Sequence, residues 1–203
     1  MSNENNGLHE RATVLKNVRI AYPNLFTPAP DAGGRDKYSC LILIEKTVDI
    51  DHVKAAVKAA IDYGVKKKWG GSKPSNLLIP IKDGDKYADA EPEKPRDFYR
   101  GHYFINAKQD PDYGKPVVYD IHGLETEAQA SINSGDFVHA VLEFFPYKGP
   151  SGSGISCSPK AIRKHSDGDV IGGGVSKTAA MAALGIDANE PKKSESDSLD
   201  DLF

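Results

Sequence analysis

The strongest strand pattern in this 203-residue chain is Asp136-Phe137-Val138-His139-Ala140-Val141-Leu142-Glu143-Phe144-Phe145-Pro146-Tyr147. Positions 137, 139, 141, 143 and 145 alternate with the apolar positions 138, 140, 142 and 144. Successive side chains of a strand point to opposite faces, so one face of this segment is predicted to enter a core. The Gly-rich stretch 149–154 then leads into a second strand at 155–163, which predicts a hairpin.

Other segments complete a mainly β pattern. One helix is predicted after Asp49 or Asp51, because Val53, Val57 and Ile61 recur at four-residue spacing before Gly70. Residues 22–34 and 73–100 are expected to be loops, the second with a turn at 83–85. Further main strands are expected at 12–20, 37–44 and 102–107, with a weaker one at 117–121. Five main strands, one main helix and long loop insertions predict a small antiparallel barrel or sandwich.

The length of 203 residues allows one domain with a sizeable core or two small ones, and 39% hydrophobic and 27% charged residues are ordinary for a soluble protein. Residues 1–10 are polar and lack a signal-peptide pattern, and no apolar run approaches the roughly 20 residues that span a bilayer. Cys40 and Cys157 lie in apolar alternating runs, which favours buried thiols in a reducing compartment. We therefore expect an intracellular protein with no membrane association.

The chain ends in an acidic segment. Residues 195–203 contain four carboxylates and no basic residue, and they end in Leu202-Phe203. Because the segment has few apolar side chains to bury, it cannot offset the conformational entropy that ordering would cost. A mobile tail is therefore expected. Without these acids, the net charge of −3 becomes a body of 26 basic and 25 acidic residues. The tail suits capture by a basic groove with an apolar pocket; the alternative is that it only keeps the protein in solution.

These features predict four regions. Residues 1–11 are a disordered N-terminus, 12–165 a folded domain, 166–186 a linker with a short helix, and 187–203 the flexible acidic tail.

Lysines gather between residues 54 and 73, where six of them face the single acid Asp62 and surround the only tryptophan. Lysines neutralise phosphates and an indole ring stacks on unpaired bases. The alternative is a solvated helix end whose tryptophan closes the core. The candidates for nucleic-acid binding are Lys66, Lys67, Lys68, Trp69 and Lys73.

Aromatic and basic residues also alternate around the predicted strand 102–107. Tyr103 and Ile105 share one face of this strand and Phe104 the other, so not every ring is free to bind a ligand. The alternative is an ordinary core strand with a polar flank. The candidates here are Tyr99, Arg100, Tyr103, Lys108 and, in the following turn, Tyr113. Tyr22 and Phe26 flank a proline loop, where rings either clamp a strand or anchor the loop.

Signatures of enzymes are weak. The glycines at 172–174 precede Lys177 at the wrong spacing for a phosphate-binding loop. The six histidines and two cysteines show no metal-ligand spacing. Asp110, Asp112 and Asp120 have the chemistry to hold magnesium in a nuclease, although such acids are more typical of turns. No catalytic residue, metal or cofactor is predicted.

Taken in order along the chain, several short motifs resemble a known family: the phage single-stranded DNA-binding proteins first described in an enterobacterial phage. The resemblance runs from about Val14 to Arg163. Its motifs are Tyr22-Pro23-Asn24-Leu25-Phe26, Lys37-Tyr38-Ser39, Lys68-Trp69-Gly70, Asp83-Gly84-Asp85, Gly101-His102-Tyr103, Ser134-Gly135-Asp136 and Gly154-Ile155-Ser156.

The resemblance implies an OB-like barrel for residues 12–165 that binds single-stranded DNA during phage replication and recombination, in the cytoplasm of the infected bacterial host. The ending Asp200-Asp201-Leu202-Phe203 is similar to the tails of bacterial and phage single-strand binders, which implies docking of phage or host replication proteins and competition with DNA. A homo-oligomer is left open. In the usual OB pattern the helix lies between the third and fourth strands, whereas here it follows the second.

Two rival functions remain on sequence grounds: a metal-dependent nuclease or recombination enzyme, and a phage structural or assembly protein. A gel shift with oligo-dT, with and without magnesium, separates the three hypotheses.

Overall fold

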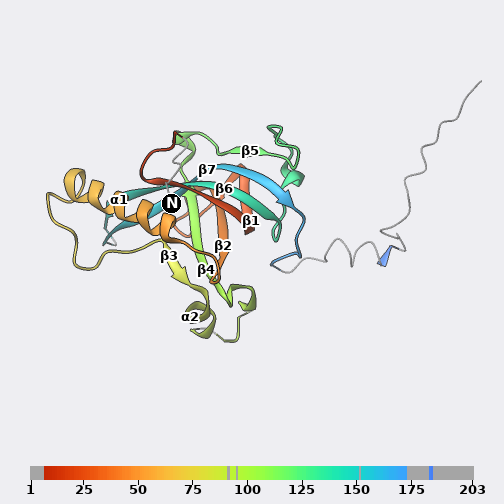
Figure 1. The fold of residues 1–203 in the computed structure, drawn as a ribbon, viewed down its shortest axis with the longest axis horizontal. Coiled ribbons are helices and arrows are strands. Elements are labelled where there is room, and N and C mark those ends of the chain that lie inside the picture. The colour runs from red at the N-terminus through yellow and green to blue at the C-terminus, as the bar shows by residue number, and fades with distance from the viewer. Residues whose placement is uncertain (1–6, 91, 95, 151, 173–182, 185–203) are drawn as a thin grey trace, which may run out of the picture. The chain divides into compact units, whose positions relative to one another are not determined.

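The computed structural model describes residues 7–90, 92–94, 96–150, 152–172 and 183–184. The chain divides into a packed unit that ends at Gly172 and a second unit, residues 173–203. The expected tail, the four terminal residues Asp200, Asp201, Leu202 and Phe203 among it, lies outside the described residues, as does most of the expected short helix. The packed unit is mainly β (Figure 1).

A single sheet of seven strands forms this unit, in the order β3-β4-β2-β1-β6-β7-β5. Its five long strands pair with antiparallel neighbours throughout, whereas the short β5 pairs in parallel with β7. The bounds are β1 (Ala12–Pro30), β2 (Asp36–Glu45), β3 (Ile81–Asp83), β4 (His102–Gln109), β5 (Val117–Tyr119), β6 (Phe137–Gly149) and β7 (Gly152–Ser166). The five main strands that the sequence predicts are therefore present, with two short strands added.

Side chains close the five long strands into a barrel. The outer members β4 and β7 pack against each other, although no ladder joins them in the described part of the chain. Across this seam, Oε1 of the buried Gln109 accepts hydrogen bonds from the Ser158 hydroxyl and, at 3.1 Å, from Lys160 Nζ. The topology and this closure are those of an OB-like barrel, which confirms the predicted fold class.

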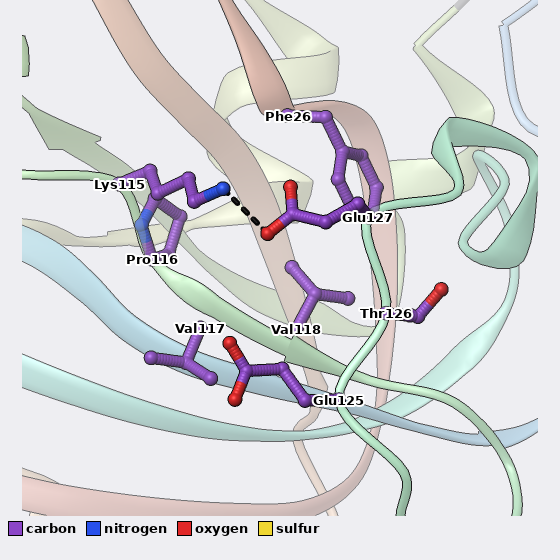
Figure 2. Close-up of a pocket in the computed structure, with 8 residues that line it drawn as sticks. All are labelled: Phe26, Lys115, Pro116, Val117, Val118, Glu125, Thr126 and Glu127. Carbon is purple, nitrogen blue, oxygen red and sulfur yellow. Dashed lines mark hydrogen bonds and ion pairs between the residues drawn. The ribbon is translucent and has the colours of Figure 1, made fainter.

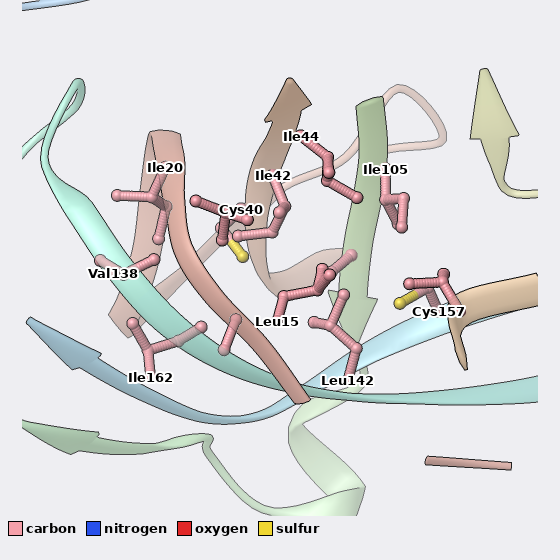
Figure 3. Close-up of a cluster of buried hydrophobic side chains, with 14 of the residues drawn as sticks. Leu15, Ile20, Cys40, Ile42, Ile44, Ile105, Val138, Leu142, Cys157 and Ile162 are labelled. Carbon is pink, nitrogen blue, oxygen red and sulfur yellow. The ribbon is translucent and has the colours of Figure 1, made fainter. Parts of the chain in front are cut away.

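The core follows the alternation of the strands. Val138, Leu142 and Phe144 of β6 are fully buried, and residues of β1, β2, β4 and β7 surround them (Figure 3). The thiols of Cys40 and Cys157 belong to the same cluster, and burial raises the pKa of Cys40 to about 12. Burying apolar area contributes roughly 25 cal/mol per Å² and is the main source of stability.

Helix α1 (Asp51–Lys67) packs chiefly on β6 and buries Val53, Ala56 and Ala60 against the core. At the start of the helix, Asp49 Oδ1 accepts a hydrogen bond from the N–H of the first helical residue, Asp51, at 2.8 Å. Lys66 and Lys67 lie in its last turn, where cations complement the helix dipole. Along the chain the helix follows β2 and precedes β4, the second and third long strands, as the sequence indicates. No helix of the described residues is long and apolar enough to cross a membrane.

Strand β1 corrects one expectation. Residues 22–30 are strand rather than loop, although the stretch contains three prolines. The ladder to β6 ends at Arg19, and hydrogen bonds from the N–H groups of Ile20 and Tyr22 to Asp136 and Ser134 extend this edge as far as Tyr22. The three prolines, which lack an N–H, all follow Tyr22, where a strand at an edge tolerates them. Tyr22 adopts a φ of 49° at a register shift in the pairing with β2. This β-bulge changes the direction of β1 between Ala21 and Asn24.

The motif Asp83-Gly84-Asp85 is likewise not a turn but the start of helix α2 (Gly84–Asp89). The Asp83 side chain caps the helix by accepting hydrogen bonds from the backbone N–H groups of Asp85 and Lys86. A Cβ at Gly84 would lie 2.0 Å from the Tyr99 carbonyl oxygen, so only glycine permits this close approach. The insertion at 73–100 thus carries β3, α2 and the 3-10 helix η1 (Asp97–Tyr99).

The packed unit extends beyond residue 165. Ile171 is 6% exposed and packs on the outer face of the sheet. Its N–H donates to the Ser134 carbonyl oxygen at 3.2 Å, and its own carbonyl accepts from the Ser134 hydroxyl at 2.7 Å. A Cβ at Gly135 would lie 1.9 Å from the Asp169 carbonyl oxygen, which explains the glycine of the Ser134-Gly135-Asp136 motif.

Candidate nucleic-acid interface

The outer face of β2 and β4 carries the strongest candidate site. In the ladder between these strands Ser39 pairs with Lys108 and Leu41 with Asn106, so these four side chains share a face. The neighbouring residues Cys40 and Ile105 point into the core instead. We call the outer face, with the loops that border it, the β2–β4 surface.

A shallow pocket of about 120 Å³ lies on this surface. Its floor is apolar where Leu41 packs with Ala21, Leu43 and Phe104 in a second apolar cluster. Polar groups are also present, since Asn24 Nδ2 donates to the Ser39 hydroxyl at 3.2 Å. The lining residues are Tyr22, Asn24, Ser39, Cys40, Leu41, Tyr99, Asn106, Ala107 and Lys108.

Aromatic rings form one wall of the pocket. The Tyr99 ring lies 4.3 Å from that of Phe98 and 4.8 Å from that of Phe104, measured between centroids. Phe98 in turn meets Tyr22 edge-on at 6.1 Å, and Tyr22 is 48% exposed. The pKa of Tyr99 is raised to about 12, first by burial and then by Tyr87 and Tyr22. The phenol is therefore neutral at physiological pH and adds no negative charge to this wall.

Cations border the same surface. Lys108 is exposed at the end of β4, and Lys82 Nζ lies 6.0 Å from the Phe104 ring on the same face. Lys108 also faces the β1–β2 hairpin: backbone hydrogen bonds from Arg35 and Gly33 lower the pKa of Asp31 first, and the charge of Lys108 lowers it further. Cations next to exposed rings are the combination that single-stranded nucleic acids require.

A polar clasp holds the aromatic wall against β4. Lys46 Nζ lies 2.7 Å from Asp83 Oδ1 and 2.6 Å from Asp85 Oδ2. These hydrogen bonds raise the pKa of Lys46 to about 12 and lower the pKa of both carboxyls. Asp85 Oδ1 also accepts from the Gly101 N–H at 2.8 Å. The clasp of Lys46, Asp83 and Asp85 therefore fixes where α2 and η1 sit relative to the strand.

A second cavity, of about 150 Å³, lies beside β5 (Figure 2). Phe26 and Val118 line it, and Lys115 Nζ meets Glu127 Oε1 at 2.5 Å across its edge. Glu125 adds a further carboxylate. Two carboxylates against one ammonium make this cavity less suited to phosphates than the β2–β4 surface.

Two of the three acids considered for magnesium have other roles. Asp110 forms an ion pair with Lys37, and the Asp120 carboxylate accepts the N–H groups of His122 and Leu124, both at 2.9 Å. Within the part of the chain that the structure describes, no group of three His, Cys, Asp or Glu side chains is arranged to hold a metal ion.

Comparison with known proteins agrees with the fold. The family model for the single-stranded DNA-binding protein of Enterobacter phage Enc34 matches residues 11–192. The chain belongs to this Enc34 family. A protein of Acyrthosiphon pisum secondary endosymbiont phage 1, p50, is 31% identical to it over 190 residues, which cover 87% of this chain and 95% of p50.

Solved structures give the same assignment. The Enc34 protein in complex with single-stranded DNA has a TM-score of 0.64 and 25% identity, and covers 79% of this chain and 89% of its own. The bacteriophage T7 single-stranded DNA-binding protein gp2.5 shares the fold at a TM-score of 0.52 and 16% identity, over 89% of this chain and 98% of its own. The Enc34 family and these solved relatives are DNA-binding proteins and not enzymes.

In this Enc34-family member, two of the predicted site residues meet on one surface. Tyr99 and Lys108 both line the pocket of the β2–β4 surface. Tyr113 lies near the same end of β4, 80% exposed on the 3-10 helix η2 (Pro111–Tyr113). Arg100 is exposed but held in ion pairs with Asp89 at 2.8 Å and Asp97 at 3.6 Å.

Trp69 and Tyr103 point to the main core, so the packing alternative describes them better. The Trp69 ring packs on the core, and its Nε1 donates to the Tyr147 carbonyl at 3.1 Å. A Cβ at Gly64 would lie 2.7 Å from this ring. Tyr103 packs on the same core, with Lys46 Nζ 5.3 Å from its ring centroid.

The lysines Lys66, Lys67, Lys68 and Lys73 are all exposed around the end of α1. Trp69 ties this region to the β6–β7 hairpin through Tyr147. None of these lysines lines the described pocket of the β2–β4 surface. They form a separate basic surface.

Sequence reasoning left Tyr22, Ser39 and Asn106 out of its binding residues. Tyr22 belongs to one of the motifs that resemble the Enc34 family, but the sequence predicts a loop for its segment. Ser39 and Asn106 become visible only through the register of β2 and β4.

Proposed function

We propose that this chain binds single-stranded DNA without sequence preference, on the β2–β4 surface. The observation that carries this proposal is that Tyr22, Tyr99 and Lys108 line one pocket on the outer face of the second and third barrel strands. This face is where OB barrels bind oligonucleotides. Membership of the Enc34 family, whose namesake has been solved with single-stranded DNA, supports it.

The chemistry explains low selectivity. The exposed Tyr22 ring offers a face on which any base can stack, and each stacked base contributes roughly 1–3 kcal/mol. Lys108 and Lys82 neutralise phosphates, which every sequence shares. The lysines beyond α1 and the exposed Tyr113 are proposed to extend this contact along the strand.

We also propose that the protein acts in phage DNA replication or recombination and that its acidic tail has two roles. The carboxylates compete with DNA phosphates for the basic surface, while Asp200, Asp201, Leu202 and Phe203 dock replication proteins. One observation supports the competition: the packed unit ends at Gly172, where a Cβ would lie 2.6 Å from the Tyr22 ring. The chain that leads to the expected tail therefore leaves the packed unit beside the proposed DNA site.

Fluorescence anisotropy with labelled oligo-dT tests the DNA site. Tyr22→Ala is expected to weaken binding about 5- to 150-fold, the loss of one stacked base. Lys108→Gln is expected to reduce the slope of log K against log salt by about 0.7, one phosphate contact. Lys58→Gln, a lysine 77% exposed on α1, is the matched control and should change neither quantity.

The DNA-site proposal fails if Tyr22→Ala and Lys108→Gln both bind like the unaltered chain. A chain that cleaves oligo-dT only with magnesium would point instead to the nuclease hypothesis.

A further inference from the structure

A second group of cations and rings lies on the outward-facing side of β6 and β7, which β1 separates from β2 and β4 in the sheet. His139 of β6 pairs in the ladder with Arg163 of β7, so both side chains face outward together. The His139 and His165 rings lie 4.8 Å apart between centroids. Arg163 also pairs with Tyr119 of β5, which adds an aromatic neighbour. With the exposed Lys16 of β1, we call the cations and imidazoles of this group the β6–β7 patch.

The β6–β7 patch is electropositive. Burial lowers the pKa of His139, and electrostatic interactions with His165, Arg163 and Lys16 lower it further. No ion pair to a carboxylate forms at these four residues in the described part of the chain.

The acids nearby are engaged elsewhere. Glu143, on the same face of β6, contacts Arg11 at 3.7 Å and Lys160 at 3.4 Å. Asp136 and Asp167 both contact Lys164, at 2.9 and 2.7 Å. The patch therefore keeps a net positive charge that its own fold does not neutralise.

Backbone geometry orients the patch. The Asn17 N–H donates to His139 Nδ1 at 3.0 Å, so Nδ1 is the acceptor and Nε2 carries the proton of the neutral ring. Asn17 adopts a φ of 52° at a shift in the β1–β6 register. This hydrogen bond holds the His139 ring beside Arg163, with a donor left for an anion.

Strand β1 connects the patch to the pocket of the β2–β4 surface. Lys16 and Tyr22 lie six residues apart on β1, at most about 20 Å at 3.3 Å per residue. Arg19 lies between them, with its guanidinium 5.6 Å from the Phe137 ring. The separation of at most about 20 Å between Lys16 and Tyr22 corresponds to roughly six stacked nucleotides at 3.4 Å each.

We infer that Lys16, His139, Arg163 and His165 form a second anchor for the phosphates of the same DNA strand, several nucleotides from the β2–β4 pocket. The inference rests on the proposed function, because the first anchor must hold DNA for a second to matter. It gives the protein a footprint longer than the pocket, with β1 beneath the connecting nucleotides.

Oligo-dT of two lengths tests the anchor on the full chain: a short one of about 3 nucleotides, roughly 10 Å long and too short to reach from the pocket to the patch, and a long one of about 20. The double variant Lys16→Gln/Arg163→Gln is expected to bind the long oligomer about 10- to 25-fold more weakly at 0.1 M salt, with a salt slope smaller by about 1.4. Binding of the short oligomer should stay within twofold.

Lys58→Gln again serves as the matched control, and thermal melting shows whether each variant is folded. If the double variant fails to fold, the exposed single change His165→Gln is tested on the same two lengths. Equal binding of the long oligomer by variant and unaltered chain overturns the second anchor alone. Failure of the unaltered chain to bind either length overturns the proposed function, and the anchor with it.

Discussion

Trp69 is a single side chain with two chemical uses, base stacking and core closure. In the structure the Trp69 ring packs on the core, and its Nε1–H donates a hydrogen bond to the Tyr147 carbonyl oxygen. Gly64 is a glycine because a Cβ there would press on this ring. The indole is therefore partly buried against the core, and its N–H donor is already paired.

Trp69→Ala is expected to lower the free energy of unfolding by about 3 kcal/mol, as large-to-small core substitutions do. Affinity for oligo-dT should stay within twofold at a temperature where the variant is folded. Urea unfolding and anisotropy measure the two quantities. Tyr22→Ala should instead lower the affinity strongly and the free energy of unfolding little. A large loss of affinity in Trp69→Ala would show that the indole contacts DNA.

His139 carries a dependence of stability on pH. Its pKa in the folded state is lowered from the ordinary value of 6.5, chiefly by burial. Below pH 6.5 the unfolded chain therefore binds more protons at this site than the folded chain does. The free energy of unfolding should decrease as pH falls from 6.5 toward the lower folded-state pKa.

His139→Gln is expected to flatten this part of the stability profile, measured by urea unfolding at several pH values. An identical decrease in both proteins would mean that other groups cause it.

At the scale of elements, the clasp of Lys46, Asp83 and Asp85 couples the insertion to the barrel. Lys46→Met removes the ammonium between two carboxylates and leaves them to repel each other. The free energy of unfolding should fall only modestly, because solvent screens the charges of this partly exposed cluster. Affinity for short oligo-dT should fall several-fold, because the Phe98–Tyr99 wall loses its support.

Lys54→Met is the matched control for the clasp. Lys54 pairs with Asp51 at 2.8 Å on the exposed surface of α1 and supports no part of the wall. The Lys54→Met substitution should change the free energy of unfolding less than Lys46→Met does and should leave affinity unaltered. An equal effect of the two substitutions on affinity would show that the clasp does not position the rings.

The sequence predicts best those elements whose periodicity is strong and long. The alternation in β6 and the four-residue spacing in α1 locate both elements and their buried faces. The sequence does not predict the second half of β1, because prolines normally exclude a strand. Here they follow Tyr22, past the hydrogen bonds that Ile20 and Tyr22 make with Asp136 and Ser134, where an edge strand tolerates them. Helix α2 was missed because Asp-Gly-Asp is typical of a turn, whereas here Asp83 caps a helix of one and a half turns.

The candidate site shows a similar limit. The two-residue period correctly separates Tyr103 and Ile105 from Phe104, so it predicts that only some rings face outward. It does not decide which face is the outer one, because both faces of β4 are apolar near Phe104. That choice depends on closure of the barrel at β7, a contact far apart in sequence.

At the scale of the whole molecule, charge is divided between body and tail. Deleting residues 195–203 removes four carboxylates and changes the net charge from −3 to +1. The truncated chain should bind oligo-dT more tightly at low salt, and the difference should shrink as salt rises, because screening weakens the competition. Anisotropy titrations of both chains measure this, and weaker binding after truncation would disprove self-competition.

The seam between β4 and β7 has a consequence for how the barrel moves. Side chains of Gln109, Ser158 and Lys160 join these strands where every other neighbouring pair of long strands shares a backbone ladder. The two edges can separate without breaking a ladder, so this is the place where the barrel widens at least cost. Hydrogen–deuterium exchange should therefore reach the amides facing this gap before those between β1 and β2.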